Sequence, residues 1–521
     1  MSRWSAHVRG VAGPQHIRTP EPLPGTTEWI FHVSNDAVDT AADARTASQG
    51  AQAAQAAPAD AGDAGYSKDL KARHVNMIAI GGAIGTGLFL GAGGRLHSAG
   101  PALAVAYLVC GIVAFFVVRA LGEMVLYRPS SGSFVSYARE FLGEKGAYVA
   151  GWMYFLNWST TCIADITAIA LYTHYWSFFT DIPQWVLALA ALAVVLAVNL
   201  ISVKWFGEME FWFAIIKVAA LVAFMFIGIF LVSTQHDVGG EKPGLNMITD
   251  HGGFLPNGLM PVVIVLQGVV FAYASLELVG VAAGETKDPQ KVVPRAVNSI
   301  MWRVGVFYVG SVVLLALLLP GSVYSADESP FVTVLSKIGV SGAGDVMNFV
   351  VLTAAMSSLN SGLYSTGRIL RSMAMAGSAP KFTAKMNRNQ VPYGGILLTA
   401  SVGVLGVALN RVVPDKAFEI VLNVASLGII GTWISIMVCH LAFVRKAKEG
   451  HLTRPDFRLP GSGVTQYVTI AFLLAVLVLM GKDAEVGRKT LFLIPLVAAG
   501  LTAGWYAIRR KQDREAAGLT K

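Results

Sequence analysis

The chain has 521 residues, of which 54% are hydrophobic and only 14% are charged. A soluble domain carries about a quarter charged residues, so this composition excludes a soluble multidomain enzyme. The net charge of +8 is concentrated in short clusters between long apolar runs. That pattern indicates the loops of a polytopic membrane protein and excludes a nucleic-acid-binding surface as its cause.

The first 65 residues differ in composition from the rest. Their segment AADARTASQGAQAAQAAPADAG is rich in Ala, Gln, Asp and Gly, and it shows no apolar periodicity. The basic-then-apolar pattern of a signal peptide is also missing. We therefore expect residues 1–65 to be a disordered cytoplasmic tail. A translation start assigned too far upstream is the alternative explanation.

Twelve apolar segments follow, each able to cross the hydrocarbon core as a helix of about 20 residues. They cover residues 74–95, 100–126, 146–176, 184–203, 209–233, 257–283, 300–320, 344–374, 393–412, 418–443, 464–481 and 490–508. Alternating the loops between two sides places 26 Lys and Arg on one side and eight on the other. The basic side is expected to be cytoplasmic, which places both termini inside. Residues 511–521 then form a C-terminal cytoplasmic tail.

The three cysteines all fall inside apolar segments, at Cys110, Cys162 and Cys439. Cysteine in such a position usually packs as a small apolar residue. Neither a metal-ligand spacing nor a disulfide framework is present in the sequence. We therefore expect no metal.

The first apolar segment contains GGAIGTGLFLGAGG, residues 81–94, in which seven of fourteen residues are glycine. Close packing between helices is one explanation, because Gly81–Gly85 and Gly87–Gly91 have the small-xxx-small spacing. A helix broken at the membrane midplane is the other. Unwound backbone there exposes N–H groups that favour an anion and carbonyls that favour a cation. An amino-acid zwitterion carries both charges.

The sixth apolar segment contains FAYASLELVGVAAGE, residues 271–285, with small residues in mid-span and the ionisable Glu277. A carboxylate at membrane depth is costly and by default marks a functional site. Breaks in spans one and six, five spans apart, predict two inverted five-helix repeats with the binding site between them.

Three motifs then allow the sequence to be compared with a known family. GGAIGTGLFLGAG, RALGEMVLYRPSSGSFVSYAREFLGEKGAYVAGWMYFLNW and SLNSGLYSTGRILRSMA resemble the amino-acid permeases of the amino acid–polyamine–organocation superfamily. The resemblance covers roughly residues 66–510. It implies an all-α polytopic membrane protein with the leucine-transporter fold, in which twelve transmembrane helices form a 5+5 inverted repeat plus two helices. GYSKDLKARHVNMIAIGGAIGTGLFLGAGGRL and KWFGEMEFWFAIIKVAALV are most similar to bacterial L-asparagine permeases.

The resemblance implies a secondary transporter of the bacterial inner membrane and not an enzyme. It would import a neutral amino acid, L-asparagine first, by proton-coupled alternating access. The proton is the coupling ion, and no other cofactor is expected. The implied partners are a small-molecule amino acid and membrane lipid, without nucleic acid. Permeases for D-alanine, D-serine and glycine, or for GABA or aromatic residues, are alternatives, and IADITAI around Asp165 resembles the D-alanine type. An amino-acid sensor without productive transport is the alternative from a different class.

The resemblance also implies backbone positions for the substrate's two charges. The carboxylate is expected at the amides of Gly85, Thr86 and Gly87. The ammonium is expected at the carbonyls of Ala83, Phe271, Ala272 and Ala274. Phe271 is further expected to be an aromatic gate over the ligand, with simple packing as its alternative.

Polar side chains on spans three and eight complete the predicted pocket. Tyr154, Trp158, Cys162 and Asp165 recur at spacings of four, four and three, which places them on one helical face. The superfamily pattern makes the first three substrate-facing, with a packing stripe as the alternative. Asp165 is expected to recognise the substrate side chain or handle protons, and structural pairing is its alternative. Ser357 and Asn360 are expected to hydrogen-bond an amide.

Three further charged residues are candidates for proton coupling or gating. Lys217 lies inside the apolar fifth span, and it resembles the lysine that stands in for a sodium ion in proton-coupled permeases. It would donate to carbonyls of residues 80–83, which predicts sodium-independent uptake. Glu277 would handle protons or bridge the halves of span six. Glu123 is expected in a cytoplasmic structural or gating network, with Arg119 one turn back as its i,i+4 ion-pair partner.

Overall fold

The computed structural model describes residues 73–74, 77, 84–284, 288–483 and 487–516. Among these residues the regular secondary structure is helical, and no strand is formed beyond one isolated bridge between Val238 and Glu241. The all-α prediction is therefore confirmed. The expected N-terminal tail lies outside the described residues, and so does Ala83.

In the described residues up to the sixth predicted span, four long helices are accompanied by short helical pieces, which include those at the glycine-rich segment of span one and at the break in span six. They are α3 (Thr86–Phe89), α4 (Gly91–Ala99), η2 (Gly100–Ala102), α5 (Leu103–Tyr127), α6 (Ser133–His174), η3 (Ser177–Phe179), α7 (Gln184–Ile201), α8 (Val203–Thr234), α9 (Asn246–Thr249), α10 (Leu259–Ile264), α11 (Leu266–Ala272) and α12 (Leu278–Ala283).

The remaining helices include one π-helical segment, η4, inside the seventh predicted span. They are α13 (Pro289–Arg303), η4 (Val304–Gly310), α14 (Ser311–Leu318), η5 (Gly321–Val323), α15 (Pro330–Lys337), α16 (Ala343–Met375), η6 (Lys381–Ala384), α17 (Tyr393–Val412), α18 (Pro414–Lys448), α19 (Val464–Met480), α20 (Gly487–Leu491) and α21 (Leu493–Ala516).

Eight helical stretches of the described chain are long and apolar enough to cross a membrane. They are Thr86–Tyr127, Gln184–Ile201, Val203–Thr234, Pro289–Leu318, Ala343–Met375, Tyr393–Val412, Val421–Lys448 and Gly487–Arg514. Two shorter apolar helical stretches are Leu259–Ala272 and Val464–Met480. Lipid cannot hydrogen-bond backbone N–H and C=O groups, whereas a helix pairs these groups with one another. An apolar run of this length is therefore stable in a membrane as a helix.

Two helices extend beyond their predicted spans. α6 begins at Ser133 instead of residue 146, and it bends at Gly143, whose φ of 81° favours glycine. The segment RPSSGSFVSYARE, which lies between the second and third predicted spans, is therefore partly continuous with the third span. α21 continues to Ala516, so the predicted C-terminal tail is helical in its first half.

The sixth predicted span is broken, as the sequence indicates. α11 ends at Ala272 and α12 begins only at Leu278. Between them Ser275 has a φ of 86°, a left-handed conformation that costs a non-glycine residue energy and that neighbouring contacts must hold.

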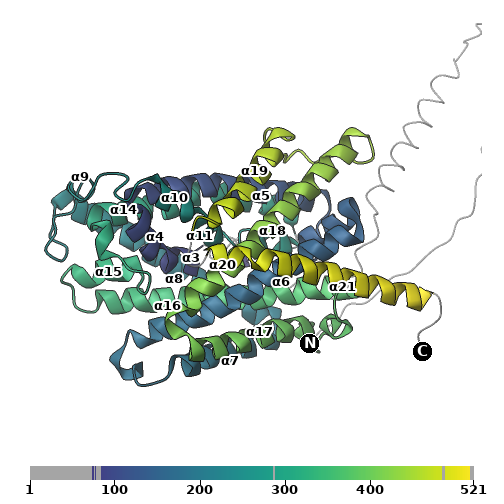
Figure 1. Cartoon of the computed structure of the whole chain (residues 1–521), viewed down its shortest axis with the longest axis horizontal. Coiled ribbons are helices and arrows are strands. Elements are labelled where there is room, and N and C mark those ends of the chain that lie inside the picture. The colour runs from purple at the N-terminus through teal and green to yellow at the C-terminus, as the bar shows by residue number, and fades with distance from the viewer. Residues whose placement is uncertain (1–72, 75–76, 78–83, 285–287, 484–486, 517–521) are drawn as a thin grey trace, which may run out of the picture. The chain divides into compact units, whose positions relative to one another are not determined.

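The start of α3 in span one and the helix α11 in span six lie side by side. α3 packs against both α11 and α16, and Figure 1 shows α3 and α11 next to one another. Around them, α6 packs against α7, α16, α17 and α18. The start of α3 and the break after α11 are thus brought together among long helices.

Candidate functional site

The chain enters the site through extended backbone at Gly85, with φ −121° and ψ −166°, after which α3 starts at Thr86. A Cβ atom on Gly85 would have Ser358 Oγ as its nearest neighbour, at 4.0 Å. Among the described residues, Gly85 therefore has room for one more side-chain atom. Ser358, which the sequence analysis missed, is the side chain next to that space.

Gly87 lies against α11 on the side that would carry a Cβ atom, and the predicted contact of its backbone amide with the substrate carboxylate stays a prediction. A Cβ atom at Gly87 would lie 2.5 Å from the Cα of Ala272, which is closer than a Cβ atom approaches a non-bonded atom in real proteins. The absence of a side chain at Gly87 thus lets α3 touch α11. The close-packing explanation holds at this glycine, and the side of Gly87 that would carry a Cβ faces a helix instead of a ligand.

Asp165 is joined to the start of α3. Thr86 donates from Oγ1 to Oδ1 of Asp165 at 3.0 Å, and both residues are buried. The second carboxylate oxygen, Oδ2, has no hydrogen-bond partner among the described residues. Leaving a buried polar atom unpaired costs about 1–3 kcal/mol, so this oxygen is available to a proton or a ligand donor.

The three carbonyls expected to receive the ammonium already accept hydrogen bonds. Phe271 O accepts from Ala274 N at 2.9 Å, and Ala272 O accepts from the Tyr308 hydroxyl at 3.2 Å. Ala274 O accepts from the Ser275 hydroxyl. A carbonyl oxygen has two lone pairs, so each of these atoms can still accept one more hydrogen bond.

Glu277 lies fully buried at the far side of the break in span six. Its Oε1 accepts from the backbone N–H of Ser275 at 3.3 Å, which helps to hold the left-handed residue. Its Oε2 has no partner among the described residues. The indole N–H groups of Trp158 and Trp433 lie close to this carboxylate, and neither forms a hydrogen bond of good geometry.

The residues predicted to share one face of span three contact two different helices. Trp158 packs on α16, where a Cβ on Gly362 would meet its ring at 2.6 Å. Tyr154 is buried, and its hydroxyl has no partner among the described residues. Cys162 instead lies against α17, because a Cβ on Gly403 would approach its Sγ to 3.1 Å. Its thiol therefore occupies a helix packing contact.

Lys217 belongs to a buried polar network that joins α8, α16 and α7. Its Nζ donates to Ser357 Oγ at 2.9 Å, and Ser357 donates to Glu210 Oε1 at 2.5 Å. Asn360 donates to Glu210 Oε2 at 3.3 Å, and Asn199 donates to the Asn360 side-chain oxygen at 2.7 Å. Ser357 and Asn360 thus have hydrogen-bond partners within the protein, and their predicted contact with a substrate amide stays a prediction.

The predicted contact of Lys217 with residues 80–83 lies outside the described residues. Glu210 was missed by the sequence analysis. Its signal was available, because a carboxylate seven residues before Lys217 on one helix lies on nearly the same face.

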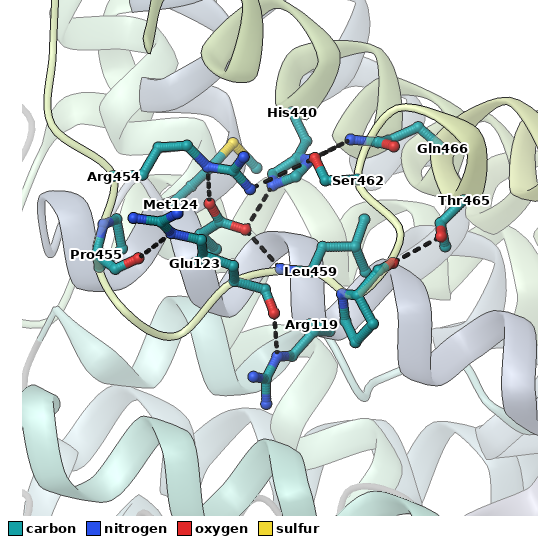
Figure 2. A network of polar contacts seen from close by, with 12 residues as sticks. Arg119, Glu123, Met124, His440, Arg454, Pro455, Leu459, Ser462, Thr465 and Gln466 are labelled. Atoms are coloured by element: carbon teal, nitrogen blue, oxygen red, sulfur yellow. Dashed lines mark hydrogen bonds and ion pairs between the residues drawn. The ribbon is translucent and has the colours of Figure 1, made fainter. Parts of the chain in front are cut away.

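The ion pair predicted between Arg119 and Glu123 is wrong. Glu123 accepts from Arg454 Nε at 2.6 Å and from the backbone N–H of Leu459 at 2.7 Å, and it pairs with His440 Nε2 at 3.0 Å (Figure 2). Arg119 stacks 3.3 Å from the ring centroid of Phe457 and donates to the carbonyl of Arg458. Both residues bind the segment between α18 and α19, which spacing along one helix does not reveal.

A cavity of about 490 Å³ lies beyond α3, lined by parts of α4, α10, α11 and α18. Arg95 forms its boundary with the site and donates to the carbonyl of Gly87 at 2.8 Å. Gln267 and Asn423 hydrogen-bond to each other across the same cavity, at 2.8 Å. Among the described residues, no group of His, Cys, Asp and Glu side chains could hold a metal ion.

Comparison with known proteins gives concordant matches. A sequence profile of the family described as amino acid permease matches residues 74–517. An L-asparagine permease from Streptomyces coelicolor is 78% identical over 484 residues, which make up 93% of this chain and 98% of that protein. An L-asparagine permease from Salmonella typhimurium is 62% identical, over 86% of this chain and 90% of its own length. L-asparagine permease 1 from Mycobacterium tuberculosis is 58% identical, over 86% and 91% respectively.

Proposed function

Because the chain belongs to the amino acid permease family, and is thus a multi-pass membrane transporter of amino acids, we propose that it imports L-asparagine. The transport is proton-coupled and proceeds by alternating access across the bacterial inner membrane. Relatives named L-asparagine permease at 58% to 78% identity, matched over most of their length, support this substrate.

The proposed membrane arrangement has twelve helices, as a 5+5 inverted repeat plus two. The excess of Lys and Arg in alternate loops supports cytoplasmic termini, with residues 1–65 and 511–521 as cytoplasmic tails and residues 66–510 as the transport domain. The broken helix at residues 273–277 in span six supports the repeat, because its counterpart in such a fold is span one.

The observation that carries the proposal is the contact between the start of α3 and the break after α11. Among the described residues there is room beside Gly85 for one more atom, and Asp165 keeps one unpaired oxygen nearby through its bond to Thr86. In the proposed complex, the backbone amides of Gly85, Thr86 and Gly87 bind the substrate carboxylate. The second lone pairs of the Phe271, Ala272 and Ala274 carbonyls, together with Ala83, bind its ammonium.

The remaining proposed roles follow from what each residue contacts. Asp165 and Lys217 handle protons, since both are buried and ionisable beside the site. Tyr154 and Trp158 form the wall of the pocket, and Phe271 closes it. Glu277 holds the break in span six, and Glu123 anchors the inner segment between α18 and α19.

Uptake of labelled L-asparagine into proteoliposomes tests the proposal. We expect accumulation when the exterior is acidified, without sodium. A competition panel of glutamine, aspartate, D-serine, GABA and phenylalanine identifies the substrate. Stronger inhibition by D-serine or phenylalanine than by unlabelled asparagine would assign a different substrate. Binding without accumulation would instead indicate a sensor.

A further inference from the structure

Glu210 and Lys217 form a pair of opposite charges on one helix, linked through a third residue. The two side chains are 0% and 1% exposed, so neither is solvated by bulk water. They lie seven residues apart on α8, about 10 Å along its axis. Ser357 of α16 bridges the gap, because its hydroxyl accepts from Lys217 and donates to Glu210.

We propose that Glu210 is the proton partner of Lys217 and that the Ser357 hydroxyl carries the proton between them. The proposal rests on the proton-coupled transport proposed above. In the transfer, the Lys217 ammonium gives a proton to Ser357 Oγ, while the Ser357 hydroxyl proton passes to Glu210 Oε1. The products are a neutral amine, a neutral carboxylic acid and an intact hydroxyl, so atoms and charge balance.

The hydrogen bonds can be satisfied before and after the transfer. Once protonated, Glu210 Oε1 donates to Ser357 Oγ, and the hydroxyl turns to donate to the Lys217 amine. Glu210 Oε2 keeps the N–H of Asn360 in both states, because carboxylate and acid carbonyl oxygens are both acceptors. Asn199 fixes that amide by donating to its oxygen at 2.7 Å. An amide so held always presents its N–H group to Glu210.

The charges around the pair give the transfer a direction. On the α6 side, Lys217 interacts with Asp165, which bonds to Thr86 at the substrate site. On α16 and α7, the network includes the neutral Ser357, Asn360 and Asn199. Glu210 lies closer than Lys217 to the start of α8, where Glu208 pairs with Arg73 at the more exposed end. A proton passed from Lys217 to Glu210 thus moves from the substrate site toward the proposed cytoplasmic end of the helix.

Two transport modes of the full chain in proteoliposomes test this role. Counterflow of labelled L-asparagine against unlabelled L-asparagine needs no net proton movement, whereas accumulation against a gradient needs it. We expect Glu210→Gln and Ser357→Ala to lower proton-driven accumulation by about tenfold or more, the usual scale for losing a proton-transfer group. Counterflow should remain within about twofold of the wild type. Ser357→Thr keeps a hydroxyl and should restore accumulation.

The controls separate the possible outcomes. Glu208→Gln removes a carboxylate from the same helix outside the network, and it should leave both modes unchanged. Undiminished accumulation by Glu210→Gln, or equal accumulation by Ser357→Ala and Ser357→Thr, would overturn the relay. Equal loss of both modes in Glu210→Gln and Ser357→Ala would also overturn it, in favour of a structural role. A wild-type protein that shows neither mode with L-asparagine contradicts the proposed function instead.

Discussion

The hydroxyl of Thr86 donates a 3.0 Å hydrogen bond to the carboxylate of Asp165, which joins the start of α3 to α6. The bond occupies one carboxylate oxygen and leaves the other without a partner among the described residues. It therefore couples the backbone segment proposed to bind substrate to an ionisable group at membrane depth.

Removing the Thr86 hydroxyl should weaken substrate binding. Thr86→Val keeps the side-chain shape, but it leaves Asp165 Oδ1 without its donor, at a cost of about 1–3 kcal/mol. We expect the KM for asparagine to rise about tenfold or more, while Thr86→Ser, which keeps the donor, stays near the wild type. Equal KM values for the Val and Ser variants would show that the bond does not position the site.

Replacing Asp165 by Asn should change how uptake depends on pH. Wild-type uptake should fall as the external pH rises, because fewer protons are available to drive it. An Asn side chain cannot titrate, so the residual uptake of Asp165→Asn should be nearly flat between pH 5 and pH 8, roughly the range in which a perturbed carboxyl titrates.

The matched variant is Glu277→Gln, which retains an oxygen acceptor for the Ser275 N–H. Its pH profile should follow that of the wild type. A wild-type profile in Asp165→Asn would place the proton route elsewhere, and a flat profile in Glu277→Gln alone would move the titrating role to Glu277.

Gly85→Ala should weaken substrate binding without lowering stability, whereas Gly87→Ala should lower stability. The Gly87→Ala methyl group would collide with backbone atoms of Ala272, so overpacking should lower stability by about 1–3 kcal/mol or more. Gly85 has an extended backbone that alanine can adopt, and among the described residues its methyl group would have only an ordinary contact, with Ser358 Oγ at 4.0 Å.

Gly85→Ala should therefore keep the wild-type Tm and bind asparagine more weakly, whereas Gly87→Ala should lower the Tm. Thermal unfolding in detergent with and without asparagine measures both effects. Full ligand-induced stabilisation of Gly85→Ala would show that the space beside Gly85 is not the carboxylate site.

Helix ends and helix breaks could be predicted from the sequence, because they depend on residues that are neighbours in the chain. The apolar run 393–412 is flanked by Pro392 and Pro414, which disfavour continuing a helix across them, and α17 spans Tyr393–Val412. Small residues and a carboxylate inside an apolar run likewise predicted the break before Leu278. The spacing of Tyr154, Trp158, Cys162 and Asp165 on span three also predicted a shared face. Only the structure shows that Cys162 lies against α17.

Partners supplied by distant segments could not be predicted in this way. The i,i+4 spacing favoured Arg119 as the partner of Glu123, yet the actual donors lie more than 300 residues later in the chain. The spacing of Glu210 and Lys217 on one helix was a local signal, but the bridge between them by Ser357 of α16 could not be predicted from it. Close packing between helices, as at Gly87, leaves the same sequence signal as a broken helix, so the two explanations separate only in three dimensions.

Replacing Lys217 by Ala should abolish transport and destabilise the protein. The substitution leaves the Glu210 carboxylate buried without its cation, and breaking a buried pair in this way costs about 3–5 kcal/mol. Adding Glu210→Gln removes the unpaired charge, so the double variant should recover most of the lost Tm but none of the proton-driven uptake. Uptake by the wild type should not require sodium. Sodium-dependent uptake, or an active Lys217→Ala, would contradict the role assigned to Lys217.

Replacing Glu123 by Gln should release the segment between α18 and α19. The carboxylate accepts from Arg454, His440 and the Leu459 N–H, and an amide group would turn a donor toward at least one of them (Figure 2). Losing these charge-assisted bonds costs about 1.5–3 kcal/mol each. The segment contains Arg458, which precedes Leu459, whereas the Arg454–Pro455 bond resists trypsin. Trypsin added to inside-out vesicles should therefore cleave Glu123→Gln after Arg458 much faster than the wild type.

Arg119→Lys is the matched control, because it keeps a cation beside Phe457 and leaves the Glu123 contacts intact. Its cleavage rate should stay near that of the wild type. Saturating asparagine should not restore protection to Glu123→Gln, since the proposed ligand site is at the broken spans and not at this segment. Unchanged trypsin cleavage in Glu123→Gln would mean that Arg119 and the packing of Phe457 hold the segment without the carboxylate, and Glu123 would then lose its anchoring role.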